Sequence, residues 1–230
     1  MRFRAPWKHA FHANFMPNTP LNSGIWPDQE PTKVLLAKAG DGDKKAVNEL
    51  LERHREAVRK LIRMRLDQRI QRRVAVSDVL QDVLVEANRR LQDYIKNPGM
   101  SFHLWLRQIA KDRMIDAFRR HRGSAKRSVD REQSLTAPRG SDRSSIMLAA
   151  RLQDHEMTPA TAATQKELAQ KVEEAIGKLG EADYEIIVMR HYEQLSNREV
   201  AEALHLTEPA ASMRYLRAIK RLRSVMEEDF

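Results

Sequence analysis

Apolar residues recur every three or four positions along most of the chain after Pro31, which is the spacing of amphipathic α-helices. The first clear example covers residues 44–66, where a Gly- and Asp-rich turn comes first and Asp43 is placed to cap the helix. Further helices are predicted over about residues 77–93, with Ser77 as the N-cap, and over about residues 101–121. The pattern therefore predicts an all-α fold.

Two interruptions of the helical pattern divide the chain. Residues 1–30 hold four of the nine prolines and no sustained period, so we expect a disordered tail, or else translation that begins at Met16. Residues 123–164 are rich in Ser, Thr, Gly, Pro and charge, which predicts a flexible linker with one short helix at "SIMLAARLQ". Two small helical domains are thus expected, at residues 31–122 and 165–230.

Residues 195–223, "LSNREVAEALHLTEPAASMRYLRAIKRLR", predict two helices joined by a tight turn. Ser196 and Glu199 have the capping-box spacing, and Thr207 is placed to cap the second helix. One side of that second helix carries Leu216, Ile219 and Leu222, and the other side carries Arg214, Arg217 and Arg221. The pattern is typical of a helix-turn-helix, whose second helix enters the major groove of DNA. A solvated basic face on an ordinary helix is the plainer alternative.

The charge balance points to a polyanionic partner, because 41 Lys and Arg residues outnumber 32 Asp and Glu residues and give a net charge of +9. The absence of cysteine excludes disulfides, Cys-ligated zinc and thiol catalysis. No apolar run approaches the roughly 20 residues of a membrane span. We find no nucleophile–base pair, no metal-ligand spacing and no phosphate-binding Gly loop. We therefore expect no enzymatic activity, no metal, no cofactor and no membrane contact.

Two helices of the N-terminal half carry unusual polar faces. One face of the second predicted helix is acidic with an apolar residue inside it, and consists of Asp78, Gln81, Asp82, Val85 and Glu86. A basic protein partner and a merely solvated surface explain this face equally well. The third helix joins Phe102, Trp105 and Phe118 to a basic end, which suits single-stranded nucleic acid. Trp105 fits a core position better than a stacking platform.

Four stretches in succession resemble blocks of the extracytoplasmic-function (ECF) type of RNA polymerase sigma factor. They are "AGDGDKKAVNELLERH", "VSDVLQDVLVEANRRL", "FHLWLRQIAKDRMIDAFRRHR" and "LGEADYEIIVMRHYEQLSNREVAEALHLTEPAASMRYLRAIKRLR". The first three are similar to sigma region two and the last to region four, in the order of the family. The resemblance covers roughly residues 31–230. It implies a factor that binds core RNA polymerase and directs it to promoters.

The resemblance also implies roles for particular residues. Region two docks on the clamp coiled coil of the largest polymerase subunit through the acidic helix face named above. The loop of residues 94–101, with Asn97, shapes the pocket for a flipped base of the minus-ten element. The backbone of that strand is held by Lys111, Arg113, Arg119 and Arg120. Region four contacts the polymerase flap and reads the minus-thirty-five duplex through Thr207, Ala210, Ala211, Ser212, Arg214, Arg217 and Arg221. The linker threads near the polymerase active site.

The resemblance has a departure and leaves two rivals. The recognition helix begins "EPAASMRY", which offers few polar groups to the bases and shifts the expected contacts toward Arg and phosphate. One rival is a stand-alone helix-turn-helix regulator, which leaves the Val85 face unexplained. The other is a nuclease with Mg²⁺ at Asp78, Asp82 and Asp116. The sigma interpretation implies a cytoplasmic protein and allows an anti-sigma factor as a further partner.

Overall fold

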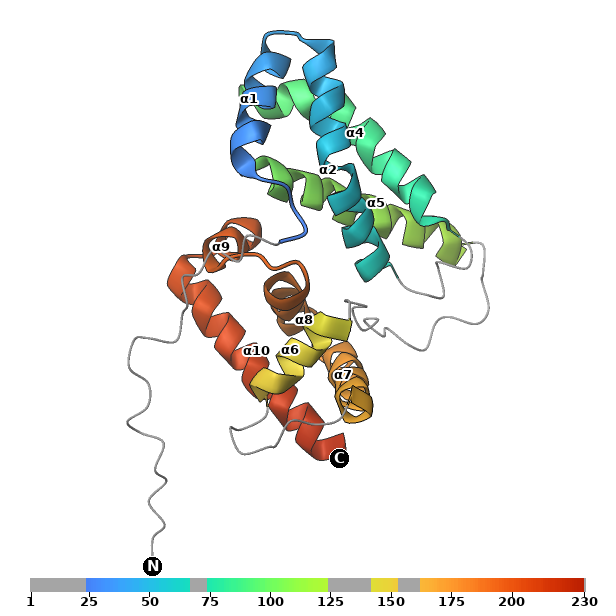
Figure 1. Ribbon diagram of the computed structural model, residues 1–230, viewed down its shortest axis with the longest axis vertical. Helices are drawn as coiled ribbons and strands as arrows, with labels where there is room; N and C mark the ends of the chain where they lie inside the picture. Colours follow the sequence, from blue (N-terminus) through green and yellow to red (C-terminus); the bar gives the residue numbers. More distant parts are fainter. Residues whose placement is uncertain (1–23, 67–73, 124–141, 153–161, 230) are drawn as a thin grey trace, which may run out of the picture.

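The computed structural model describes residues 24–66, 74–123, 142–152 and 162–229, and these parts are helical without any strand. They form two units, shown in Figure 1. The N-terminal unit contains α1 (Gln29–Gly40), α2 (Lys44–Arg65), α4 (Val76–Lys96) and α5 (Phe102–Gly123). The C-terminal unit contains α6 (Asp142–Leu152), α7 (Ala162–Gly177), α8 (Glu181–Ile187), the π-helical turn η2 (Val188–Tyr192), α9 (Asn197–Leu204) and α10 (Glu208–Asp229). The predicted all-α fold with two helical units is confirmed.

The N-terminal unit is a bundle in which α2 packs on α1, α4 and α5. The predicted cap of α2 is present, because the Asp43 carboxylate accepts hydrogen bonds from the backbone N–H groups of Lys45 and Ala46 at 2.8 and 3.2 Å. Gly42 precedes it with φ of +90°, a conformation that favours glycine. Leu50, Leu61 and other apolar residues of the predicted stripe are fully buried in the core.

The predicted start of α4 is wrong by a short distance. The helix begins at Val76 after Ala75, and Ser77 makes no cap: its hydroxyl lies 3.4 Å from the Asp78 carboxylate instead. The helix also runs to Lys96, past the predicted end. Tyr94 explains the extension, because its ring is buried and its hydroxyl donates to the Met100 carbonyl at 2.9 Å. This bond closes the loop between α4 and α5.

In the C-terminal unit, α10 packs along α7, α8 and α9, and α6 packs on α7 and η2. Ser145 of α6 is fully buried, and its hydroxyl is 2.5 Å from the Glu173 carboxylate and 3.1 Å from the Tyr192 hydroxyl. These contacts join α6 to two other elements of the unit. The short helix expected inside the linker therefore exists, but it belongs to the C-terminal unit.

The domain boundaries need corresponding corrections. Ile25 and Trp26 pack against the hydrophobic core and α1 begins at Gln29, so the N-terminal unit starts before residue 31. The C-terminal unit starts at Asp142 rather than at residue 165. The rest of the expected tail and the greater part of the expected linker, residues 1–23, 124–141 and 153–161, lie outside the described residues. Among the helices described, none is long and apolar enough to cross a membrane.

Candidate polymerase and promoter interfaces

The predicted acidic face of α4 lines a shallow groove between α4 and α5. The groove is lined by Asp78, Gln81, Asp82, Val85, Glu86, Arg113, Asp116, Arg119 and Arg120. All five residues expected to bind polymerase are thus brought together. Three of the four basic residues expected to bind the minus-ten strand line the same groove. Sequence reasoning assigned these two sets to different surfaces, and the structure places them on one.

Ion pairs organise the groove. Arg120 lies 3.1 Å from Asp82, and Arg113 lies 3.1 Å from Asp116. A hydrogen bond from Arg89 holds the pKa of Glu86 below its usual value. Arginines therefore neutralise Asp82 and Asp116, two of the three carboxylates that the nuclease rival would give to Mg²⁺. The described residues contain no cluster suited to a metal ion. We call this surface the α4–α5 groove.

Val85 remains the anomaly of this surface, because 62% of its area is exposed in the middle of the charged groove. A lone exposed apolar residue is common on protein surfaces. Here its neighbours are charged groups already aligned along one groove, so a partner that fits the groove would bury Val85 as well. This arrangement favours protein docking over simple solvation.

The loop between α4 and α5 leaves Asn97 exposed above an aromatic cluster. The Trp105 ring lies 4.7 Å from the Tyr94 ring and 5.5 Å from the Phe102 ring, between ring centroids. Trp105 is half-buried and packs against the core. The core interpretation of Trp105 fits these contacts, and the cluster gives the loop a rigid base.

The beginning of α5 touches the C-terminal unit. The backbone N–H of Ser101 donates to the Glu202 carboxylate at 2.6 Å, and His103 Nε2 lies 3.0 Å from Glu199 Oε1. Burial alone would raise the pKa of Glu199, but hydrogen bonds from His103 and Ser196 outweigh it and lower the pKa to about 2. Two glutamates of α9 therefore lie against the end of the loop that carries Asn97.

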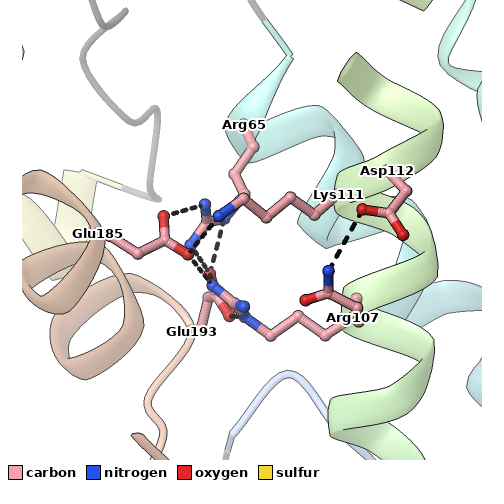
Figure 2. A network of polar contacts seen from close by, with 7 residues as sticks. Arg65, Arg107, Lys111, Asp112, Glu185 and Glu193 are labelled. Atoms are coloured by element: carbon pink, nitrogen blue, oxygen red, sulfur yellow. Dashed lines mark hydrogen bonds and ion pairs between the residues drawn. The ribbon is translucent and has the colours of Figure 1, made fainter. Parts of the chain in front are cut away.

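A buried ionic cluster joins the two units further along α5. Figure 2 shows Arg65, Arg107 and Lys111 directed toward Glu185 and Glu193. Arg107 Nη2 lies 2.6 Å from Glu185 and Arg107 Nε lies 2.5 Å from Glu193. Arg65 Nη1 lies 2.8 Å from Glu185, and Arg65 also pairs with Glu193. Each glutamate therefore bridges both arginines. Lys111 Nζ is 3.7 Å from Glu185 and completes the cluster.

This interdomain cluster is almost dry. The side chain of Glu193 is fully buried, and those of Arg107 and Arg65 are 4% and 9% exposed. Burial alone would raise the pKa values of Glu185 and Glu193, but the two arginines lower both, so the carboxylates stay charged. Removing one partner of such a buried pair leaves an uncompensated charge, which costs about 3–5 kcal/mol.

The π-helical turn positions Glu193. The turn replaces the end of α8, and the backbone N–H of Glu193 donates to the Val188 carbonyl at 3.0 Å. Gln194 then adopts a left-handed conformation, with φ of 58°. Sequence reasoning did not find this cluster. Glu185 and Glu193 lie near the two ends of the largely apolar segment "YEIIVMRHYE". A charge in such a segment needs a partner, and this is the only local sequence feature that points to the cluster.

The predicted helix-turn-helix is formed by α9 and α10. Ser196 and Glu199 make the reciprocal capping box at 3.2 and 2.7 Å, and His205 ends α9 in a left-handed conformation. The Thr207 hydroxyl accepts from the Ala210 N–H at 3.3 Å, which confirms the second cap. Asn197 donates to the Glu208 carbonyl at 3.0 Å and ties the two helices together.

Two family models match the chain, in the order of the two units. The model for "Sigma-70 region 2" matches residues 50–124, and the model for "Sigma-70, region 4" matches residues 169–222. The chain is 28% identical over 206 residues to the RNA polymerase sigma factor CnrH of Cupriavidus metallidurans, covering 87% of this chain and 97% of CnrH. This chain is an ECF-type RNA polymerase sigma factor. It directs promoter-specific transcription initiation, and the stand-alone regulator is not favoured.

The fold of this sigma factor is similar to a solved structure of CnrH in complex with the cytosolic domain of CnrY. The TM-score is 0.52 at 25% sequence identity, with 87% of this chain and 100% of the other covered. The N-terminal unit thus contains region two and the C-terminal unit contains region four. The α4–α5 groove belongs to region two, and the interdomain cluster joins region two to region four.

The recognition helix α10 of this sigma factor is turned differently from the prediction. Ala211 is fully buried, so its predicted contact with DNA is wrong. Leu216 was expected in the core and is 44% exposed, because Ala218 and Leu222 occupy the buried side together with Ala211. Arg221 is not free to leave for a phosphate without cost, since it pairs with the buried carboxylate of Asp183.

The outward face of α10 is instead mixed. Met213 is 54% exposed and lies one turn before Arg217, whose Nε donates to the Met213 carbonyl at 3.3 Å. Arg217 and Lys220 are exposed beside Leu216. Thr207 is exposed, and Ala210, Ser212 and Arg214 are half-buried. The helix therefore presents two large apolar side chains among cations.

Proposed function

We propose that this sigma factor docks on the clamp coiled coil of core polymerase through the α4–α5 groove. The observation that carries the proposal is the exposed Val85 inside a groove of aligned ion pairs. Arg113, Arg119 and Arg120 then belong to the docking surface. In the free protein Arg113 pairs with Asp116 and Arg120 pairs with Asp82. The partner would exchange these weak surface pairs for its own charges while it covers Val85.

The proposed promoter contacts follow from the two remaining surfaces. The loop with Asn97, held by Tyr94 and the aromatic cluster, captures a base of the minus-ten element in the nontemplate strand. The face of α10 with Met213, Leu216 and Arg217 enters the major groove of the minus-thirty-five duplex. Arg217 suits guanine or phosphate, while apolar side chains suit the methyl group of thymine.

The described structure is a closed form that cannot hold both elements at once. The two elements are about 25 base pairs apart by their names, which is on the order of 80 Å at about 3.4 Å per pair. Ser101, beside the base-capturing loop, is hydrogen-bonded to Glu202 of region four. The 22 residues of α10 make a helix only about 33 Å long. Region four must therefore move away from region two when the factor assembles with core polymerase.

Run-off transcription with core polymerase tests the docking proposal. Asp82→Arg is expected to abolish specific transcripts, because it places a cation beside Arg120 in the groove. Glu52→Arg, an equal change of charge on an exposed face of α2, is the control and should retain transcription. Equal activity of the two variants would contradict docking through the groove.

A protein regulator is also proposed. CnrH is bound to the cytosolic domain of CnrY in the solved structure. We infer a comparable partner, an anti-sigma factor, acting in the cytoplasm on this chain. Affinity capture from its own cells with wild type and Asp82→Arg should yield core polymerase with wild type alone and the regulator with either protein, if the regulator uses another surface.

A further inference from the structure

Region four covers one continuous stripe of α5 with a row of glutamates. His103, Arg107 and Lys111 are spaced four residues apart, so they lie on one face of the helix, about 6 Å from one to the next. At the start of the stripe, the backbone N–H of Ser101 donates to Glu202, and His103 pairs with Glu199. The stripe continues with Arg107, which contacts Glu185 and Glu193, and with Lys111, which contacts Glu185.

Every group of this stripe is a donor that suits a phosphate oxygen. A backbone N–H, an imidazole, a guanidinium and an ammonium follow one another, and Arg65 of α2 adds a second guanidinium beside Arg107. Arg forks bind carboxylate and phosphate with the same bidentate geometry. The stripe starts at the loop with Asn97, the part of region two that is proposed to capture an unpaired base.

The partners come entirely from the other unit. Within the described residues, the helices of each unit pack closely on one another. The polar contacts of Ser101, His103, Arg107 and Lys111 named above all run to the other unit. When region four moves away, Arg65 and Arg107 lose both of their counterions. A buried charge cluster of this kind costs desolvation, so it contributes less to stability than its short distances suggest. Its charge pattern is better explained by an anion that replaces the glutamates.

We propose that this stripe is a phosphate track for single-stranded DNA, and that the four glutamates of region four occupy it as a built-in competitor. The ligand is the sugar–phosphate backbone of the strand whose base enters the Asn97 loop. The proposal rests on the sigma function and deepens it. It keeps Lys111 among the expected phosphate contacts, adds Arg65 and Arg107, and leaves out Arg113, Arg119 and Arg120, which face the α4–α5 groove.

The experiment measures binding of the free factor to a fluorescein-labelled single-stranded DNA of about 12 nucleotides, a length within the usual site sizes. The double variant Glu185→Gln and Glu193→Gln removes the competing charges and is expected to bind at least about 10-fold more tightly than wild type at low salt. Glu167→Gln with Glu174→Gln changes the net charge equally on the exposed face of α7. This control should stay within about twofold of wild type.

A second comparison tests the track itself. Adding Arg65→Gln and Arg107→Gln to the Glu185→Gln, Glu193→Gln variant should reverse the gain and reduce the slope of log affinity against log salt by about 1.4, because each phosphate contact contributes about 0.7 for a single strand. Far-UV circular dichroism verifies that all variants keep their helices.

Two results would overturn the proposal. If the Glu variant binds no better than its charge control, the glutamates are not competitors. If its gain survives the loss of both arginines, the strand binds elsewhere. Run-off transcription by the wild-type factor with core polymerase separates these results from a failure of the sigma function, because that assay does not depend on how the free protein binds DNA.

Discussion

The two sides of α5 use the same kinds of charge in opposite ways. On the side facing α4, Arg120 and Asp82 pair at 3.1 Å while their side chains are 62% and 48% exposed. On the side facing region four, Arg107 and Glu193 pair at 2.5 Å with side chains that are 4% and 0% exposed. Water screens the first pair and is excluded from the second. The ion pairs on the exposed side can exchange partners at little cost, whereas the buried ion pairs hold the two units together.

Disrupting the interdomain cluster should have the largest effect. Arg107→Leu removes one of the two arginines that neutralise Glu185 and Glu193, and we expect up to about 3–5 kcal/mol of destabilisation of the closed form. Opening of the two units relieves this cost, because Glu193 then reaches water. Small-angle X-ray scattering should therefore show a larger radius of gyration with unchanged helix content.

Arg120→Leu is the matched control on the other side of α5. An exposed pair contributes about 1 kcal/mol or less, so this variant should scatter like wild type. The contrast between the two sides would be lost if both variants stayed compact.

A buried histidine that belongs to neither side of α5 shows how burial acts on a charge that has no ionic partner among the described residues. Burial lowers the pKa of His54 from 6.5 to about 4, although its hydrogen bond to Leu50 acts in the opposite direction. Between pH 6.5 and about 4, the unfolded chain therefore binds a proton at His54 that the folded chain does not bind. Stability is complete above pH 6.5 and falls by up to about 3 kcal/mol as the pH drops to 4.

Urea denaturation of wild type and His54→Gln between pH 7 and 4 measures this effect. The variant should be less stable at pH 7 and should lose less stability on acidification. Parallel pH profiles for the two proteins would show that His54 titrates normally.

The exposed side of α5 should matter for binding rather than for stability. Val85→Asp is expected to weaken the affinity for core polymerase by about 10- to 100-fold, since burial of a Val contributes about 1.5–3 kcal/mol. Its free energy of unfolding should change little, because the side chain is already in water. Val34→Asp on α1, where Val34 is 55% exposed, provides a control outside the groove. Equal affinities for polymerase would remove Val85 from the interface.

The smallest expected effect concerns the recognition helix. Replacing single thymines of the minus-thirty-five duplex by deoxyuracil removes one methyl group at a time. Contact with Met213 or Leu216 should make one such replacement cost about 0.8 kcal/mol, or about fourfold in affinity. Met213→Ala or Leu216→Ala should cancel the sensitivity to that methyl group. Duplex binding that ignores every methyl group would limit α10 to Arg and phosphate contacts.

Local chemistry explains which features could be predicted. The capping box of Ser196 and Glu199 and the Asp43 cap depend on residues within three positions of one another, and both are present. The Ser77 cap failed because a serine two residues inside a helix looks the same in sequence as one at its start. Leu216 was predicted to lie in the core because the large apolar residues were taken to define the buried side of the helix. In the structure the small Ala211 and Ala218 face the core instead.

The interdomain cluster could not be predicted for a different reason. Arg65 and Glu193 are 128 positions apart, and nothing in their neighbourhoods says that they meet. The same holds for the α4–α5 groove, where Arg120 was assigned to DNA although it pairs with Asp82 across two helices. Periodicity gives the face of a helix, but the neighbour of that face is decided by tertiary packing. In both cases the sequence shows the charged residue but not the residue with which it pairs.

The most direct test of the closed form is the distance between regions two and four in the free factor and in complex with core polymerase. The chain has no cysteine, so Asn88→Cys on α4 and Glu167→Cys on α7, both exposed, can carry a unique pair of spin labels. We predict a single distance in the free protein, set by the closed form, and an increase on the order of tens of ångströms with core polymerase, given the roughly 80 Å between the promoter elements. The same distance in both samples would contradict the account.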